Sequence, residues 1–382
     1  MRRLLLTGTA LLLATGCRRP LDADASAIKS PTPDPTLGVV SVETVASGLV
    51  HPWAIEFLPD GRMLVTERPG RLRLVSSDGS VSAPLSGVPT VHAQGQGGLL
   101  DVALDPDFAN NQRVYLTYAE PGEGGVGTAA ARGRLTEAGL VDVEVIYRQR
   151  PKLEGNGHFG SRLVFARDGK LFITQGDRQS YRERAQDLTQ GMGKIVRINA
   201  DGSIPPDNPY VGNASAQPEI WSFGHRNLQG ATLHPETGAL WTIEHGARGG
   251  DELNHPEPGK NYGWPVITYG RDYSGLPIGE GTAREGMEQP VYFWDPVIAP
   301  SGMTFYTGTR YAGWQGSLLI GSMNPGGLVR LTLRDGRVVA EERHLSEIRE
   351  RIRDVTQGPD GFVYVVTDSP NGRVLRVVPA SR

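Results

Sequence analysis

Residues 161–177 read SRLVFARDGKLFITQGD: an apolar segment, a turn at Asp168 and Gly169, and a second, more strongly apolar segment. Asp and Gly suit the turn, because Gly takes a positive φ without strain and Asp bonds to the backbone nearby. Side chains alternate between two faces in an extended segment such as residues 170–174, KLFIT. The pattern favours a strand hairpin that packs between neighbouring sheets.

The same strand–turn–strand unit recurs along the chain. The copies are spaced roughly 45–70 residues apart, a period typical of propeller blades with loop insertions. We therefore predict an all-β fold, a six-bladed β-propeller of four-stranded antiparallel sheets. A generic array of β-sandwiches is the alternative, and residues 246–300 must be mostly loop. The six copies lie at residues 53–67, 99–119, 161–177, 230–246, 301–323 and 352–368.

The composition agrees with many short strands and narrows the possible partners. The 382 residues include 50 Gly and 28 Pro, the residues that make turns. The formal net charge is −3, and no block of basic residues is present. We therefore predict no nucleic-acid partner.

The N-terminus has the pattern of an export signal. Arg2 and Arg3 precede a mostly apolar stretch, residues 4–14, that is too short to span a bilayer. Small residues before Cys17, the only cysteine, resemble the lipobox of bacterial lipoproteins. We predict a lipoprotein signal peptide over residues 1–16, a lipid anchor on Cys17, a flexible tether over 17–37 and a propeller domain over 38–382. The protein is then an exported periplasmic or cell-envelope lipoprotein that meets the membrane only through this anchor; an ordinary cleaved signal peptide is the alternative.

Several polar segments stand next to the predicted strands. A propeller brings loops that are distant in sequence onto one face, where they can form a site. The segments are GQGGLL (95–100), NGHFGSRL (156–163), FGHRNLQG (223–230), EHGARGGDELN (244–254), KNYGWP (260–265) and RIRD (351–354).

Together and in this order, these segments resemble the soluble quinoprotein glucose/sorbosone dehydrogenase family, most closely its aldose sugar dehydrogenase branch. The resemblance runs from about residue 41 to the C-terminus. It implies oxidation of an aldose sugar to its lactone by pyrroloquinoline quinone (PQQ), with calcium ions and an external electron acceptor.

The resemblance gives His158 the role of general base. A histidine with a pKa near neutrality can take the proton of the anomeric hydroxyl. A structural histidine beside a turn is the alternative. The glucose branch has an Asp before this base, whereas Gly157 stands here, so a different group, or none, must orient the imidazole.

Other positions correspond to cofactor-binding residues of the family. Guanidinium groups suit the carboxylates of PQQ, and Arg351 and Arg353 alternate with Ile352, so both can point to one face of a strand. A solvated charged edge is the alternative for this pair, and a packed loop aromatic is the alternative for Tyr273. Asn324 stands where the family has a cofactor-binding Lys, which puts cofactor affinity in doubt. The predicted cofactor-binding residues are Gln96, Arg226, Asn227, His245, Tyr273, Asn324, Arg351 and Arg353.

The resemblance also implies two calcium ions. One would bind the carbonyl oxygens of Gly246 and Ala247, and the other the Glu252 carboxylate and the Tyr262 carbonyl. Calcium accepts such oxygen ligands in flexible geometry. An exposed acidic turn at Asp251 and Glu252 is the alternative.

Two other functions fit a propeller of this kind. A calcium-dependent sugar lactonase would need a carboxylate-rich metal site on the propeller axis, and His158 with the arginine pair argues against it. A non-catalytic propeller could instead bind glycans or protein partners, and Gly157 and Asn324 favour that alternative.

Overall fold

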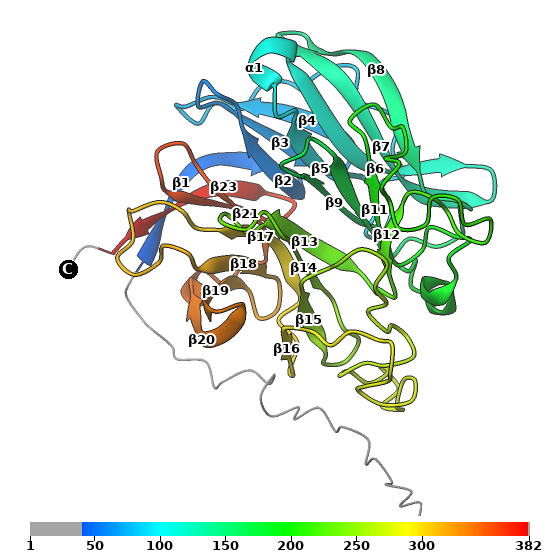
Figure 1. Cartoon of the computed structure of the whole chain (residues 1–382). Coiled ribbons are helices and arrows are strands. Elements are labelled where there is room, and N and C mark those ends of the chain that lie inside the picture. Colours follow the sequence, from blue (N-terminus) through cyan, green and yellow to red (C-terminus); the bar gives the residue numbers. More distant parts are fainter. Residues whose placement is uncertain (1–39, 381–382) are drawn as a thin grey trace, which may run out of the picture.

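The computed structural model of the chain describes residues 40–380, which form a six-bladed β-propeller (Figure 1). The predicted signal peptide, the Cys17 anchor and the tether over 17–37 lie outside the described residues. The short helical elements are α1 (Phe108–Asn111), η2 (Arg182–Gln186) and η3 (Ser346–Ile348). The first blade has strands β2 (Pro52–Phe57), β3 (Met63–Glu67) and β4 (Arg71–Val75), and the second has β5 (Leu99–Leu104), β6 (Arg113–Gly122), β7 (Gly125–Thr136) and β8 (Gly139–Arg148). The third has β9 (Gly160–Phe165), β10 (Leu171–Gln175), β11 (Lys194–Ile198) and β12 (Ile220–Phe223), and the fourth has β13 (Leu228–Leu233), β14 (Leu240–Glu244), β15 (Asp251–Asn254) and β16 (Tyr292–Trp294). The fifth has β17 (Pro300–Phe305), β18 (Leu318–Ser322), β19 (Gly327–Arg334) and β20 (Arg337–His344), and the sixth has β21 (Ile352–Gln357), β22 (Val363–Thr367), β23 (Gly372–Pro379) and β1 (Val40–Leu49).

The innermost strands of the blades form a closed ring. Contacts join β2 to β5, β5 to β9, β9 to β13, β13 to β17, β17 to β21 and β21 back to β2. The first described strand, β1, closes the ring by pairing antiparallel with β23 in the last blade, and Figure 1 shows them side by side in blue and red. No helix within residues 40–380 is long and apolar enough to cross a membrane.

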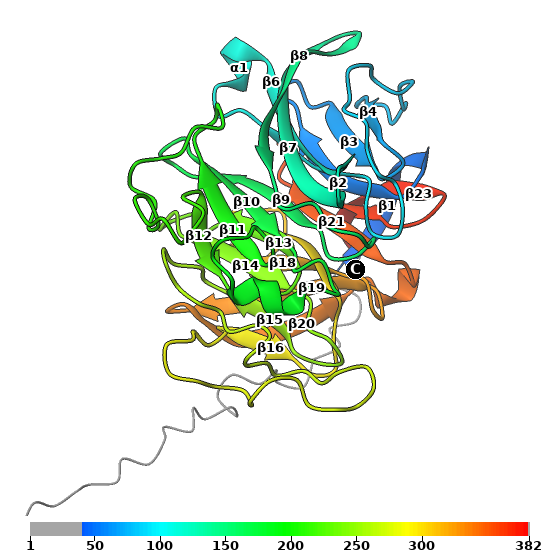
Figure 2. The same ribbon diagram turned by 90° about the vertical axis from the view of Figure 1, so that its right-hand side faces the viewer.

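The six predicted blades are confirmed, with an irregular outer edge in the first blade. Its fourth position is filled by a loosely paired segment that bridges at Val75 and Val81 and bonds through Ser82 N to Leu74 O at 2.9 Å. The predicted long loop between the fourth and fifth copies is also present. It carries only the short strands β15 and β16, and Figure 2 shows its yellow segments extending beyond the sheets.

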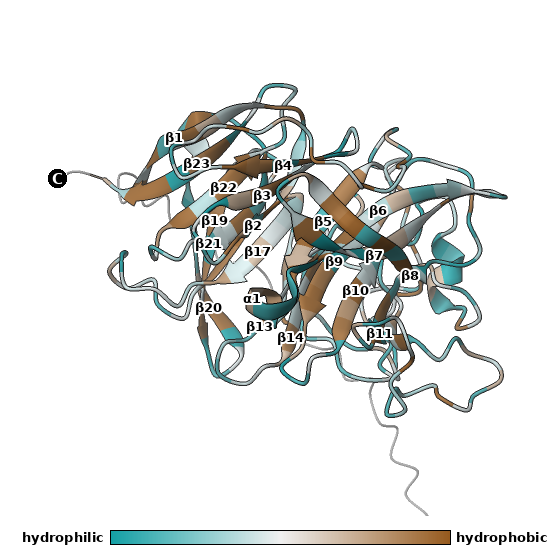
Figure 3. Ribbon diagram, turned by 90° about the horizontal axis from the view of Figure 1, so that it is seen from above, coloured by the Kyte–Doolittle hydropathy of each residue, from teal (hydrophilic) through white to brown (hydrophobic). Residues whose placement is uncertain are grey.

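Apolar side chains alternate along the strands because each blade faces two neighbours. Leu171 and Ile173 of β10 pack toward the second blade, whereas Phe172 between them packs toward the fourth. One apolar cluster fills each of the six gaps between blades. Figure 3 shows the result from above, with brown strands between mostly teal loops.

The hairpin turns have the Asp-Gly chemistry that the sequence predicted. In the third blade Gly169 has φ 78° and its amide donates to Ala166 O at 3.0 Å. The Asp168 carboxylate accepts from the Lys170 amide at 3.2 Å. The turns at Gly61 and Gly361 repeat this arrangement, with φ 86° and 79°. A positive φ is easily reached by Gly, so these turns fix the hairpins of three blades.

A buried arginine joins the innermost strands at the axis. Arg162 Nη1, on β9, lies 2.9 Å from Asp101 Oδ1 on β5 and 3.0 Å from Asp354 Oδ1 on β21. Each Asp also accepts a backbone amide from a neighbouring blade, Leu163 N at 2.7 Å and Ile55 N at 3.0 Å. The two carboxylates and the guanidinium therefore link four of the six inner strands.

The same guanidinium also contacts three other positions on the inner strands. Its Nε donates to Gln229 O on β13 at 2.8 Å, and its Nη2 donates to Arg353 O at 3.2 Å. The Trp53 ring of β2 lies 4.1 Å from the guanidinium carbon. On the remaining inner strand, a β-carbon at Gly302 would collide with Asp354 Oδ1. Arg162 thus joins its own strand to four other inner strands, and the sixth, β17, packs against its partner Asp354.

Replacing Arg162 by Met keeps much of the side-chain volume but leaves Asp101 and Asp354 buried without their cation. Breaking a buried ion pair in this way is strongly destabilising. We expect the free energy of unfolding, measured by chemical denaturation, to fall by about 3–5 kcal/mol.

Arg134→Met is the matched control, because it removes the same charge from an exposed ion pair with Asp142. It should cost less than about 1 kcal/mol. An equally small loss for Arg162→Met would show that the axial ion pairs do not hold the blades together.

Candidate active site

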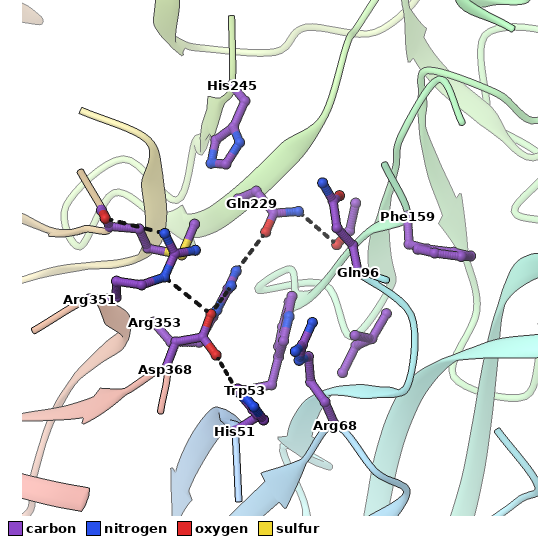
Figure 4. Close-up of a pocket in the computed structure, with 13 residues that line it drawn as sticks. His51, Trp53, Arg68, Gln96, Phe159, Gln229, His245, Arg351, Arg353 and Asp368 are labelled. Carbon is purple, nitrogen blue, oxygen red and sulfur yellow. Dashed lines mark hydrogen bonds and ion pairs between the residues drawn. The ribbon is translucent and has the colours of Figure 1, made fainter. Parts of the chain in front are cut away.

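One face of the propeller carries a cavity of about 310 Å³ to which all six blades contribute (Figure 4). Its wall is formed by the ends of the two innermost strands of the blades and by the loops next to them. The lining residues are His51, Trp53, Arg68, Gln96, Leu100, Phe159, Gly160, Gln229, His245, Met323, Arg351, Arg353 and Asp368.

The cavity is cationic. Three guanidinium groups, of Arg68, Arg351 and Arg353, face a single carboxylate, that of Asp368, so with the two histidines left aside the lining has a net charge of +2. Arg353 Nη2 donates to Asp368 Oδ2 at 2.5 Å, and His51 Nδ1 lies 2.9 Å from Asp368 Oδ1. Burial opposes ionisation of Asp368, but Arg353 outweighs it and holds the pKa of this carboxyl well below its usual range.

Two donors of the lining lack acceptors. Arg353 Nη1 donates to Gln229 Oε1 at 3.1 Å, but the buried Arg353 Nε has no acceptor within the described residues. The Nε of Arg68 is likewise buried and unpaired there. An unpaired buried N–H costs about 1–3 kcal/mol. An anion bound in the cavity would balance the excess positive charge of these guanidinium groups.

His158 lies directly behind the cavity wall formed by Phe159, Gly160 and Gln96. Its backbone amide donates to Gln96 Oε1 at 2.9 Å, and its φ of 50° places it in the left-handed region. Its ring Nδ1 lies 2.7 Å from Asp177 Oδ1. The carboxylate can only accept, so Nδ1 carries the proton and Nε2 is left as the acceptor. No residue within 40–380 bonds to Nε2.

Asp177 is itself held firmly. Trp264 Nε1 donates to Asp177 Oδ2 at 2.7 Å, and Gln179 N donates to Oδ1 at 2.7 Å. Burial lowers the pKa of His158 below its ordinary value, while the bond to Asp177 opposes this shift. The imidazole is therefore neutral at neutral pH. Asp177 therefore orients the imidazole, the role for which Gly157 offers no side chain.

The neighbouring segment 225–230 supports this wall. Asn227 Oδ1 accepts from Gly160 N at 3.3 Å and from Gln229 Nε2 at 3.2 Å. Arg226 Nη1 donates to the carbonyl oxygens of His245, at 3.0 Å, and Gly246, and its Nε is buried and unpaired within the described residues. Arg226 and Asn227 are thus next to the cavity rather than in its lining.

His245 lines the cavity as a neutral side chain. Its Nε2 lies 2.6 Å from Pro300 O, so this nitrogen donates. Burial lowers the pKa of His245 to about 3. Three other predicted cofactor-binding residues, Gln96, Arg351 and Arg353, also line the cavity.

Two predicted cofactor residues do not reach the cavity. Tyr273 is 71% exposed on a small hairpin closed by Asp272 N and Leu276 O, and it points to solvent. Asn324 is exposed in the turn after β18, whereas the preceding residue, Met323, lines the cavity. Neighbouring side chains at the end of a strand face opposite sides, so Met323 faces the cavity and Asn324 faces away from it.

Beside the main cavity lies a second, water-sized one of about 10 Å³. Its lining includes two carboxylates on paired strands, Glu244 and Glu252, the Arg226 guanidinium, and Gly246 and Tyr262. Asn254 Nδ2 donates to Glu244 Oε1 at 3.1 Å and Glu252 Oε2 at 3.4 Å, while Asn254 Oδ1 is buried without a partner in the described part of the chain.

Burial and the neighbouring Glu244 raise the pKa of Glu252 well above its usual range. A cation would relieve this repulsion and would accept the free oxygen of Asn254 as a ligand. Ala247, the other predicted carbonyl ligand, is buried next to Gly246 but does not line the small cavity. No group of three or more His, Cys, Asp and Glu side chains within residues 40–380 has metal-binding geometry.

Sequence reasoning missed Asp177, Asp368, Arg68, His51, Trp53 and Gln229. Strand register carries the signal that would have found four of them. Gly160 pairs with Gln175, which brings His158 and Asp177 together just beyond the pair. Ile352 pairs with Thr367 in the same way, which places Arg351 beside Asp368. Pro52 pairs with Glu67, which places His51 beside Arg68.

Comparisons with known proteins identify the family. The family model for glucose/sorbosone dehydrogenases matches residues 49–376. The aldose sugar dehydrogenase YliI of Escherichia coli (strain K12) is 47% identical over 346 residues, 89% of this chain and 93% of that protein. A crystal structure of a glucose dehydrogenase has a TM-score of 0.87 at 52% identity and covers 89% of this chain and 100% of that one. The PQQ-bound aldose sugar dehydrogenase of Streptomyces coelicolor has a TM-score of 0.74 at 28% identity, covering 91% and 100%. This chain therefore belongs to the glucose/sorbosone dehydrogenase family.

Proposed function

We propose that the protein is a PQQ-dependent aldose sugar dehydrogenase that oxidises the anomeric carbon of the sugar and yields the lactone. The observation that carries the proposal is the neutral His158, oriented by Asp177, directly behind the wall of a cationic cavity. The similarity to a sugar dehydrogenase over most of both chains supports the same activity.

The cavity suits an anionic, planar cofactor. Arg351 and Arg353 would hold its carboxylates, because guanidinium groups bind carboxylates through paired hydrogen bonds and stay charged at any relevant pH. Gln96 lines the same cavity and would supply neutral hydrogen bonds, while Asn227 and Arg226 stand behind its wall. When bound, PQQ supplies the two-electron acceptor for the hydride of the sugar.

The chain's own residues handle the proton. His158 Nε2 would take the proton of the anomeric hydroxyl while the hydride leaves the same carbon, so the C–O bond becomes the carbonyl of the lactone. Asp177 would keep the imidazole in the tautomer that leaves Nε2 free and would stabilise the imidazolium that forms. The two electrons then pass to an external acceptor.

The small cavity suits calcium. The Glu252 carboxylate and the Tyr262 carbonyl remain its proposed ligands, and the geometry adds the oxygens of Glu244 and Asn254 as neighbours. The carbonyls of Gly246 and Ala247 are the proposed ligands of the cofactor-linked ion. Gly246 O already accepts from Arg226, so an ion there would share this carbonyl with the guanidinium.

A lactonase is disfavoured by the axis of the propeller. Three carboxylates, of Glu56, Asp101 and Asp354, do gather there, but the Arg162 guanidinium occupies the position between the two aspartates. The axis thus carries its own cation where a lactonase would bind its metal.

His158→Ala tests the base. Purified wild-type protein with PQQ and calcium should reduce an artificial dye when aldoses are added, and the variant should lose about 10²–10⁴-fold in kcat. PQQ binding, followed by its absorbance band, should persist in the variant. His234→Ala, at the turn of the fourth blade, is the control and should keep full activity. Dye reduction by no sugar at saturating PQQ would refute the function, and full activity of His158→Ala would refute the assignment of the base.

Asp177→Asn tests the orienting carboxylate through the pH profile. Asp177 raises the pKa of His158, whereas burial and the nearby Arg226 and Arg178 lower it. Without the carboxylate the pKa of His158 falls further, so the acidic limb of kcat/KM should move to lower pH. The kcat should also fall, by about 10²-fold or more, because the imidazole loses its fixed tautomer. An acidic limb that stays in place or moves to higher pH would contradict this role.

Glu252→Gln tests the calcium site. In the wild type, calcium should raise the thermal midpoint, because a ligand that binds only the folded state stabilises it by about 2.7 kcal/mol at 100 times its Kd. The variant should bind one calcium ion fewer by metal analysis and lose most of this stabilisation. Glu285→Gln, in the exposed part of the same long loop, should match the wild type. Equal calcium content in the variant and the wild type would rule out Glu252 as a ligand.

A further inference from the structure

Arg68 is a cation of the cavity to which neither the sequence motifs nor the proposed chemistry gives a role. It follows β3 directly, at the position that His245, Met323 and Asp368 occupy after the second strands of the fourth, fifth and sixth blades. All four residues line the cavity. The residue after the second strand is therefore a position from which these blades contribute to the site.

The backbone of Arg68 is held in place from both sides. Its amide donates to His51 O at 3.1 Å, and its carbonyl accepts from Leu99 N at 3.1 Å. Gly98 packs so closely that a β-carbon there would collide with Arg68 O, and its φ is 138°. The side chain thus starts from a fixed point in the wall.

The other arginines of the same hairpin and its flanks have carboxylate partners. Arg71 and Arg73 pair with Glu67 at 2.6 and 3.1 Å, and Arg62 pairs with Asp60 at 2.6 Å. Arg68 has no carboxylate partner within residues 40–380. Its Nη1 donates to Gly95 O at 2.7 Å, while its Nε is buried and has no acceptor in the described part of the chain.

Figure 4 shows the Arg68 guanidinium rising beside Trp53 into the space that Gln96 and Arg353 also face. Asp368 does not satisfy it, because this carboxylate is engaged by Arg353 and His51. Burial lowers the pKa of Arg353, and the charges of Arg351 and Arg68 lower it further. The repulsion between the two guanidinium groups would be relieved by an anion in the cavity.

We propose that Arg68 binds a carboxylate of the cofactor from the side of the first blade, sharing the anion with Arg353. The inference rests on the proposed function, since PQQ is the anion that this function places in the cavity. Both guanidinium groups line the cavity, and charge-assisted bonds from two such groups are among the strongest that a carboxylate can accept.

Equilibrium binding of PQQ to the metal-loaded full chain, followed by quenching of tryptophan fluorescence, tests the proposal. Arg68→Gln should raise the Kd for PQQ about 10- to 100-fold, the range for losing a hydrogen bond to a charged group. Arg68→Lys keeps the charge but loses the planar fork, so its Kd should lie in between. Arg62→Gln removes the same charge near the far turn of the hairpin and should leave the Kd unchanged.

The trimethyl ester of PQQ, which lacks the carboxylate charges, separates charge recognition from a change in shape. The difference between wild type and Arg68→Gln should largely disappear with this probe. The KM for the sugar at saturating PQQ should not change. A Kd within twofold of the wild type in Arg68→Gln overturns the inference, as does a raised sugar KM with an unchanged Kd. If the wild type itself binds no PQQ, the proposed function fails together with the inference.

Near-UV circular dichroism verifies that each variant is folded. If Arg68→Gln does not fold, the same comparison is made with Arg68→Lys.

Discussion

The Arg162 guanidinium lies on the propeller axis, where Asp101, Asp354, Gln229, Arg353 and Trp53 converge on it from four other blades. A propeller blade packs only against its two neighbours, so the apolar clusters between blades do not by themselves fix how opposite blades meet. A cation at the centre with directional hydrogen bonds does fix how these blades meet. Its fork can satisfy acceptors on several strands at once because the guanidinium is planar and carries five N–H donors.

The same centre also supports the floor of the cavity. Arg162 binds the carbonyls of Arg353 and Gln229, and the side chains of these two residues bond to each other in the wall above. Burial, Asp101 and Asp354 raise the pKa of Glu56 to about 8, so this third axial carboxyl is mostly protonated at neutral pH. The axis therefore carries one guanidinium against two ionised carboxylates rather than three, a net charge of −1 that is smaller than the +2 of the cavity lining above it.

The strand hairpins could be predicted from the sequence because each is a local unit, with its Asp-Gly turn and its alternating apolar residues in one segment. His158, Gln96, His245, Arg351 and Arg353 could be placed at or beside one site because they lie in recognisable segments. Asp177 and Asp368 could not, since their roles depend on the pairing register between two strands, Gly160 with Gln175 and Ile352 with Thr367. The exposed positions of Tyr273 and Asn324 could not be predicted for a related reason: which way a side chain faces depends on the exact end of a strand or turn.

Repetition of the scaffold explains how one face can hold such varied chemistry. The position after the second strand carries Arg68, His245, Met323 and Asp368 in four blades, a cation, a neutral donor, an apolar wall and an anion. In the third blade the corresponding residue is Gly176, where any β-carbon would collide with His158 O. This blade therefore has no side chain at that position, and the loop that precedes β9 can approach closely. This loop carries His158, and Asp177, the residue after Gly176, orients its imidazole. The position of His158 therefore depends on a glycine where other blades carry a side chain.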